Sequence, residues 1–384
     1  MVSKAFTLSE ELKVPVLMRV VTRLAHSRAA VSLSEPGSQN ELCPSEDRGW
    51  VLLPAIARRQ YLKLIDKQPQ IKEAAAWSAF NRLEKEEGAG LGIVACGIAY
   101  NYVKEALAAD PARKASILKL SQYPLPADAL RELASSCREI LVVEDGQPVV
   151  EESLKALVGA GYPVKGRLTG NLPRTGELDP DSVAAALGAA AAAGHAPARN
   201  LAARPPQLCP GCGHRDVYKA LNEVAAESPG ARIFGDIGCY TLGALPPFRS
   251  LASCVDMGAS ITMAKGAADA GVFPAIAVIG DSTFTHSGMT GLLDAVNDGS
   301  PITVVISDNL TTAMTGGQDS AGTSKYEAIC KGLGVDPEHV RVVVPTPTNI
   351  PEITRILREE IAYRGVSVVI PRRECMQTLK RKKK

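Results

Sequence analysis

The chain has 384 residues, of which 46% are hydrophobic and 22% are charged, as is ordinary for a globular protein of two or three domains. Lys and Arg number 43 against 41 Asp and Glu, and only 4% of residues are aromatic, so we expect no nucleic-acid partner. No apolar run approaches the roughly 18 residues of a membrane span, and no secretion signal is visible, which predicts a cytoplasmic protein without a membrane partner.

The first segment with a structural pattern is Lys13–Arg28, a short apolar run that ends in basic and hydroxyl residues. We interpret it as a strand with the loop that follows, although nothing before it could supply the rest of a sheet. A polar stretch rich in turn residues, 31–48, is predicted to be a loop. Residues 1–89 are therefore interpreted as the remnant of a preceding domain with its loop or linker.

An α/β domain is predicted over residues 90–165. GIVACGIAY predicts a buried strand that begins near Gly92, and NYVKEALAA predicts a helix. LVVEDG predicts a further strand, and EESLKALVGAG an amphipathic helix that ends at glycine. Strands and helices that alternate at this pitch are typical of a parallel sheet. Residues 166–206 are interpreted as a linker, because their second half is alanine-rich and ends in Pro205 and Pro206.

A third unit, residues 207–376, is predicted to hold a parallel sheet with the strands ARIFGDIG, FPAIAVIGD, PITVVISDN and VSVVIP. Its middle strands end in Asp or Asn followed by turn residues. Because ligands bind at the carboxyl ends of strands in an open parallel sheet, this edge is the first candidate for a site. Residues 377–384 form a basic tail, which we interpret as a solvated end.

Two neighbouring strand ends carry side chains with oxygen atoms. Gly280-Asp281-Ser282 follows one predicted strand, and Asp308-Asn309 follows the next. Such oxygens can hold Mg²⁺, which accepts oxygen ligands and leaves positions for phosphate. Gly280 would let a pyrophosphate approach the backbone, and the helix that follows offers free N–H groups. The alternative is a pair of ordinary turns, since these dipeptides are common at strand ends.

Cysteine spacing indicates a second site. Cys209 and Cys212 form a C-x-x-C pair, and Cys239 and Cys375 follow at a distance. A zinc ribbon would more often show a second such pair, and a thioredoxin-like pair would follow a strand directly. Four thiolates suit a [4Fe–4S] cluster. Five further cysteines have no partner at ligand spacing and are interpreted as core or incidental residues: Cys43, Cys96, Cys137, Cys254 and Cys330.

The segment 280–318, GDSTFTHSGMTGLLDAVNDGSPITVVISDNLTTAMTGGQ, resembles the thiamine-diphosphate motif of the 2-oxoacid:ferredoxin oxidoreductases along its whole length. The resemblance implies cofactor contacts from Gly280, Asp281, Ser282, Thr283, Asn309 and Thr311. Of these, Asp281, Asn309 and the main-chain carbonyl of Thr311 would bind Mg²⁺. Ser282 and Thr283 would face the pyrophosphate.

The segment CPGCGHRD resembles the opening of the cofactor domain in the same family, where four cysteines at these places hold a cluster. The resemblance implies that Cys209, Cys212, Cys239 and Cys375 bind a [4Fe–4S] cluster. Related indolepyruvate enzymes often have proline where Gly213 stands. The histidines of CGHR and STFTHSG, and the segments GDIGCY and CVDMGASI, also match. They imply active-site or cofactor-lining roles for His214, His286, Gly238, Asp256 and Gly258.

Most of the chain resembles the large subunit of indolepyruvate:ferredoxin oxidoreductase, through segments such as KLSQYPLPADAL and KGRLTGNLPRTGEL in the same order. Residues 90–165 would be a transketolase-C-terminal-like domain, and residues 207–376 the thiamine-diphosphate-binding domain with a three-layer fold. The family's pyrimidine-binding domain would precede Leu12, and its ferredoxin-like domain would follow Cys375; both are expected to be missing.

The resemblance implies oxidative decarboxylation of an aryl 2-oxoacid to an acyl-CoA, with electrons passed to ferredoxin. It also implies coenzyme A as a substrate and a hetero-oligomer with a smaller β subunit. The activity is expected to need the missing domains or another subunit. Two alternatives stay open. A nonoxidative thiamine-diphosphate-dependent 2-oxoacid decarboxylase would need no cluster. A non-catalytic metal-binding subunit of a complex would hold metal without the cofactor.

Overall fold

The computed structural model describes residues 1–33, 35–39, 41, 50–76, 78–189, 200–201 and 205–382. Parts of the predicted linker and of the predicted basic tail lie outside the described residues. The chain divides into two compact units, Met1–Ala198 and Arg199–Lys384, and each is treated below by itself. Within the described residues, no helix combines the length and the apolar character that crossing a membrane requires.

The first unit opens with three helices, α1 (Val2–Leu12), α2 (Thr22–His26) and α3 (Pro54–Ala76). The strand predicted within Lys13–Arg28 is wrong, because the segment carries α2 and extended chain instead. A strand needs a neighbouring strand to pair its N–H and C=O groups, and none of the described strands pairs with this segment.

A five-stranded sheet follows, in the order β1-β3-β2-β4-β5. Its strands are β1 (Arg82–Glu84), β2 (Leu91–Cys96), β3 (Ala115–Leu120), β4 (Glu139–Val143) and β5 (Val164–Lys165). All neighbours are parallel except β1, which pairs antiparallel with β3. The sheet confirms the α/β character predicted for this part of the chain.

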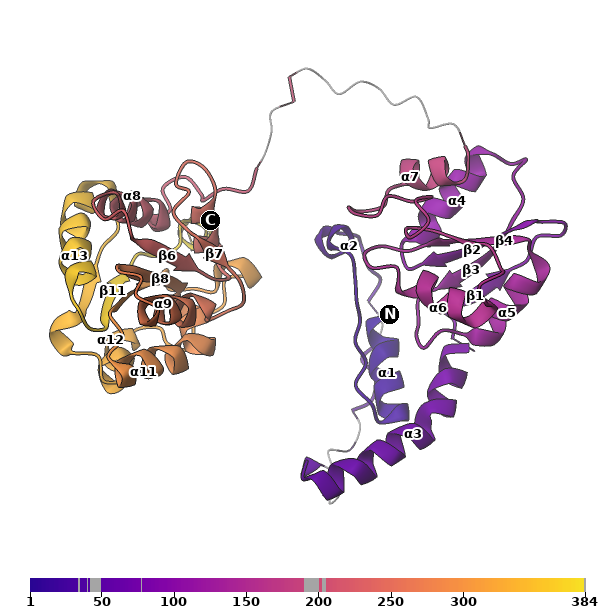
Figure 1. The fold of residues 1–384 in the computed structure, drawn as a ribbon, viewed down its shortest axis with the longest axis horizontal. Helices are drawn as coiled ribbons and strands as arrows, with labels where there is room; N and C mark the ends of the chain where they lie inside the picture. The colour runs from indigo at the N-terminus through magenta and orange to yellow at the C-terminus, as the bar shows by residue number, and fades with distance from the viewer. Residues whose placement is uncertain are drawn as a thin grey trace. The chain divides into compact units, whose positions relative to one another are not determined.

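Helices cover both faces of this sheet (Figure 1). α4 (Ala99–Ala109) and α7 (Pro180–Ala186) share one core with β2 and β4, whereas α5 (Ala127–Ser136) and α6 (Val149–Val158) share the other. The structure departs from the predicted linker here. Four side chains between residues 166 and 187 are buried in the first core: Leu172, Leu178, Val183 and Leu187. Their apolar side chains pack this stretch onto the sheet, so a linker does not begin at residue 166.

The second unit contains a fully parallel six-stranded sheet in the order β10-β11-β9-β8-β6-β7. Its strands are β6 (Arg232–Gly235), β7 (Ser253–Cys254), β8 (Ala275–Gly280), β9 (Ile302–Ser307), β10 (Val340–Val343) and β11 (Ser367–Pro371). The central strands β8 and β9 are buried along their whole length, which explains why they appear in the sequence as continuous apolar runs.

Helices also cover both faces of the second sheet, so the unit has three layers (Figure 1). α9 (Ala259–Asp269), α11 (Met289–Asp298) and α12 (Tyr326–Gly332) pack on one face. α8 (Gly213–Ala226) and α13 (Ile350–Ala362) pack on the other. This arrangement confirms the predicted α/β fold class with a parallel-sheet, three-layer second unit.

Topology locates the site of the second unit. The chain leaves β6 towards β7 on one side and leaves β8 towards β9 on the other, so the strand order reverses between β6 and β8. Ligands bind at the carboxyl ends of strands beside such a reversal. The segments that follow the two strands are Asp236–Cys239 and Asp281–Thr283, and both contain residues predicted for the site.

Candidate functional site

Asp281 is the first residue after β8, and its carboxylate is buried, with 3% of the residue exposed. One carboxylate oxygen accepts a hydrogen bond of 2.7 Å from the N–H of Ser282. The other, Oδ2, has no hydrogen-bond partner among the described residues. Burial, together with the charge of Asp308, raises the pKa of Asp281 to about 6, against the N–H groups of Ser282, Thr311 and Asn309. A buried carboxylate with a bare oxygen, that is, an oxygen without a hydrogen-bond partner, is a candidate ligand for a cation.

Asp308, at the end of β9, has the opposite surroundings. Its carboxylate accepts a hydrogen bond of 2.6 Å from Nε of Arg372 and one of 3.2 Å from the N–H of Leu310. Leu310 has a φ of 60°, a left-handed conformation that is uncommon outside glycine. The guanidinium group already neutralises Asp308, so the uncompensated charge in this pair belongs to Asp281.

The loop after β9 places the remaining predicted magnesium ligands beside Asp281. The side-chain oxygen of Asn309 accepts a hydrogen bond of 3.1 Å from the N–H of Thr311, which holds the amide in a local turn. The hydroxyl groups of Ser282 and Thr312 lie 2.6 Å apart and join the two strand-end loops. Asp281, Asn309 and Thr311 are thus brought to one place, as the sequence predicted for the two strand ends.

Three glycines of the site are packed closely against neighbouring residues, two of them against an aromatic ring. A Cβ atom on Gly280 would lie 2.6 Å from Cε1 of Tyr240, and one on Gly238 would overlap the same ring. Gly258 has a φ of +94°, and a Cβ atom there would lie 2.7 Å from the hydroxyl oxygen of Ser287. Close packing therefore requires glycine at all three positions, in addition to any need for a cofactor to approach the backbone.

Asp236 was missed by the sequence analysis, although it follows β6 as Asp281 follows β8. It is fully buried, and it accepts hydrogen bonds from the Tyr240 hydroxyl, from the N–H of Gly258 at 3.1 Å, and from both the N–H and the hydroxyl of Ser260, at 3.2 and 2.6 Å. Burial raises the pKa of Asp236, against these donors. Asp256, for which the family resemblance implied a cofactor-lining role, has an exposed position.

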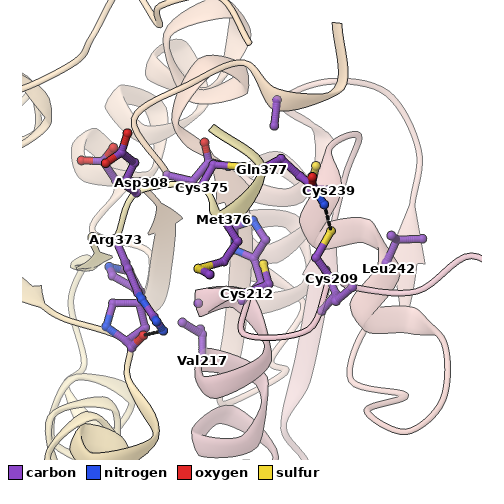
Figure 2. Close-up of a pocket in the computed structure, with 18 of the residues that line it drawn as sticks. Cys209, Cys212, Val217, Cys239, Leu242, Asp308, Arg373, Cys375, Met376 and Gln377 are labelled. Carbon is purple, nitrogen blue, oxygen red and sulfur yellow. Dashed lines mark hydrogen bonds between the residues drawn. The ribbon is translucent and has the colours of Figure 1, made fainter. Parts of the chain in front are cut away.

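The four predicted cysteine ligands line one cavity of about 260 Å³. Figure 2 shows Cys209, Cys212, Cys239 and Cys375 around it. The first two lie on a turn in which the N–H of Cys212 donates to the carbonyl of Cys209 at 3.1 Å. The N–H of Cys375 donates to the carbonyl of Asn309 at 3.0 Å, which ties the cavity to the loop after β9.

All four thiols are free. Burial raises the pKa of Cys212 and, with the neighbouring cysteines, raises that of Cys239 to about 11. The described part of the chain contains no group of three or more His, Cys, Asp or Glu side chains already arranged around a metal. Four thiols that share one cavity are suitable ligands for a metal that prefers sulfur. They are not already arranged in the geometry of a bound metal.

The two predicted histidines lie in different surroundings. His214, on the first turn of α8, lines the cysteine cavity and is buried, with 6% exposed. Burial lowers its pKa to about 4, so the imidazole is neutral at neutral pH. His286 lies in the turn Phe284–Gly288 after β8, is exposed, and has Nδ1 3.1 Å from the hydroxyl oxygen of Ser287. It does not line the cysteine cavity.

The amino-acid sequence is similar to those of known proteins. Residues 236–370 match the family model "Thiamine pyrophosphate enzyme, C-terminal TPP binding domain". The chain is 36% identical to indolepyruvate oxidoreductase subunit IorA of Methanothermobacter thermautotrophicus, over 97% of this chain and 64% of that protein. It is 35% identical to the IorA subunit of Archaeoglobus fulgidus, over 96% of this chain and 62% of that protein.

Among solved structures, 2-oxoglutarate:ferredoxin oxidoreductase from Magnetococcus marinus matches 46% of this chain and 69% of that one, with 20% identity and a TM-score of 0.37. The chain thus spans less than two thirds of the length of the curated relatives it matches.

Proposed function

We propose, from its similarity to the IorA subunits of indolepyruvate oxidoreductase, that the chain is the cofactor-binding part of an indolepyruvate-type 2-oxoacid:ferredoxin oxidoreductase. The observation that carries the proposal is the buried Asp281 carboxylate with a bare oxygen, next to a loop that also borders a cavity with four cysteines. One end of the sheet then offers a cation site and a sulfur-ligand site together.

The residues at the strand ends fit magnesium and a diphosphate. Asp281, Asn309 and the carbonyl of Thr311 would hold Mg²⁺, which accepts oxygen ligands. Ser282, Thr283 and the backbone at Gly280 would contact the diphosphate, and Gly238, Asp256 and Gly258 would line the rest of the cofactor. Bound thiamine diphosphate supplies a ring that accepts the electron pair left when a 2-oxoacid loses carbon dioxide. The protein supplies placement and charge complementarity.

Cys209, Cys212, Cys239 and Cys375 would hold a [4Fe–4S] cluster, whose iron atoms are bound by four thiolates. A cluster next to the thiamine site would accept single electrons, which distinguishes an oxidoreductase from a simple decarboxylase. His214, neutral and buried at the cavity wall, would offer a hydrogen bond without adding charge. His286, which is exposed after β8, would contribute to the active site from its solvent side.

The proposed reaction converts an aryl 2-oxoacid and coenzyme A into an acyl-CoA and carbon dioxide, with electrons passed to ferredoxin. The relatives are named as subunits, which favours a hetero-oligomer with a smaller β subunit. The domain predicted from residue 90, extended to residue 187 by the side chains that pack on its sheet, would be the transketolase-C-terminal-like domain. Residues 207–376 would be the thiamine-diphosphate domain.

Anaerobic purification followed by visible absorption, iron analysis and thiamine-diphosphate analysis tests the proposal. We expect a brown protein with about four irons per chain, as one four-iron cluster requires, together with bound cofactor. Asp281→Ala should lose the cofactor, whereas Asp294→Ala, a change at an exposed carboxylate on α11, should keep it. A colourless protein that binds the cofactor would favour the decarboxylase, and metal without cofactor would favour a non-catalytic subunit.

A further inference from the structure

Helix α14 (Met376–Lys382) begins directly after Cys375, and its first turn lies beside the cysteine cavity. Hydrogen bonds at both ends fix its place. The N–H of Cys375 donates to the carbonyl of Asn309 at 3.0 Å, and the guanidinium of Arg381 donates to the carbonyl of Gly316 at 3.0 Å. Both acceptors belong to the loop after β9, so this loop holds the side chains of α14 in position at the cavity.

One side chain of that first turn reaches a cysteine. The amide nitrogen Nε2 of Gln377 donates a hydrogen bond to Sγ of Cys209 at 3.3 Å, across 168 residues of sequence. Figure 2 shows the amide of Gln377 directed at this sulfur. Among the described residues, no other side chain donates such a bond to any of the four cysteines of the cavity.

The charged side chains around the cavity form hydrogen bonds or ion pairs with groups other than the four cysteines. Arg373 donates to the carbonyl of Pro345 at 2.8 Å and lies 3.6 Å from the Asp216 carboxylate. Glu374 pairs with a lysine of α14 at 2.5 Å. Much of the remaining lining is apolar: Leu208, Val217, Leu242, Met314 and Met376. The Gln377–Cys209 hydrogen bond is itself exposed to solvent, so its effect depends on direct contact of the N–H group with the sulfur and not on a dry environment.

We propose that Gln377 sets the reduction potential of the iron–sulfur cluster held by the four cysteines, through its N–H···S hydrogen bond to Cys209. The inference rests on the proposed function, since it presumes that cluster. Reduction adds negative charge that the coordinating sulfurs share, and an N–H group aimed at one of them stabilises the reduced state. Gln377 is a positioning residue and not a ligand, so its loss should change the potential while the cluster remains.

The test is a redox titration of the anaerobically purified full chain, followed by electron paramagnetic resonance. Gln377→Met keeps the length of the side chain and removes the donor, and its midpoint potential should shift to a more negative value. Thr378→Val is the matched control, because it removes a polar group from the next residue of α14, outside the cavity lining. Its midpoint should equal that of the unmodified chain.

Iron and thiamine diphosphate are measured on every sample, which separates the two ways of failing. An unmodified chain without iron overturns the proposed cluster, and this inference with it. Iron in all samples with equal midpoints overturns the role of Gln377 alone. Gln377→Leu is a second variant without the donor; if both Gln377 variants lose iron while Thr378→Val keeps it, the residue supports cluster assembly and the tuning proposal is wrong.

Discussion

The bare carboxylate of Asp281 should destabilise the fold when no cation is bound, and replacing it should show by how much. Burial raises the pKa of Asp281 from 3.8 to about 6. At 1.36 kcal/mol per pKa unit, this difference of about two units corresponds to about 3 kcal/mol. Asp281→Asn keeps the size of the side chain and removes the ionisation, so the metal-free variant should be more stable than the unmodified chain by up to about 3 kcal/mol at pH 8.

The pH dependence follows from the direction of the shift. A carboxyl group whose pKa is raised in the folded state binds its proton more tightly there than in the unfolded chain. Its stabilising contribution is complete below the unfolded pKa of 3.8 and is lost as the pH rises through about 6. The advantage of Asp281→Asn should therefore be small near pH 4, grow between pH 4 and 6, and level off above that range.

Urea unfolding in the presence of a chelator and without thiamine diphosphate measures this difference. Amide hydrogen exchange in peptides from β2 and β4 reports the first unit and serves as an internal control. Unfolding of the second unit is followed by amide hydrogen exchange in peptides from β8 and β9. Equal stability of the two proteins at pH 8, or a difference that does not depend on pH, would refute the reasoning.

Three further results are expected. Magnesium with thiamine diphosphate should raise the unfolding midpoint of the unmodified chain in a concentration-dependent way and leave that of Asp281→Asn unchanged; an equal rise in both would contradict the assigned ligand. Tyr240→Phe removes the hydroxyl donor to buried Asp236 and should cost about 1–3 kcal/mol, read from hydrogen exchange in the second unit. Gly166→Ala would place a Cβ atom 2.8 Å from Cδ of buried Glu151 and should cost about 1–3 kcal/mol in the first unit, read from hydrogen exchange in peptides from β2 and β4; unchanged exchange would show that the neighbouring chain yields.

The sequence was enough to predict the structure wherever a local pattern of residues determines it. β8 and β9 are continuous apolar runs, and the turn residues that follow them were visible as Gly280-Asp281 and Asp308-Asn309. Because parallel strands end at one edge, these local patterns also predicted that the two loops would meet. The same logic failed for Lys13–Arg28, where a short apolar run lacks a strand partner, and for residues 166–187, where buried leucines lie between turn residues.

Contacts between distant parts of the chain were not predictable in this way. Gln377 has no pattern of its own, and its contact with Cys209 exists only because the loop after β9 holds α14 at the cavity. Asp236 could have been found, since it follows β6 as the other two strand-end acids follow their strands. What the sequence concealed is that its donors come from the segments around Gly258 and Tyr240.

The contrast between Asp281 and Asp308 shows why residue type alone does not define a cation site. Both are acids that follow adjacent strands, and from the sequence either could be a metal ligand. Arg372, 64 residues further along the chain, donates to Asp308 and also pairs with Glu327, so that carboxylate is compensated within the protein. No described residue does this for Oδ2 of Asp281. If Arg372 were replaced by Met, Asp308 would become a second bare carboxylate beside the first, and the repulsion between them should raise the pKa of Asp281 further and weaken the metal-free fold more at pH 8 than at pH 4.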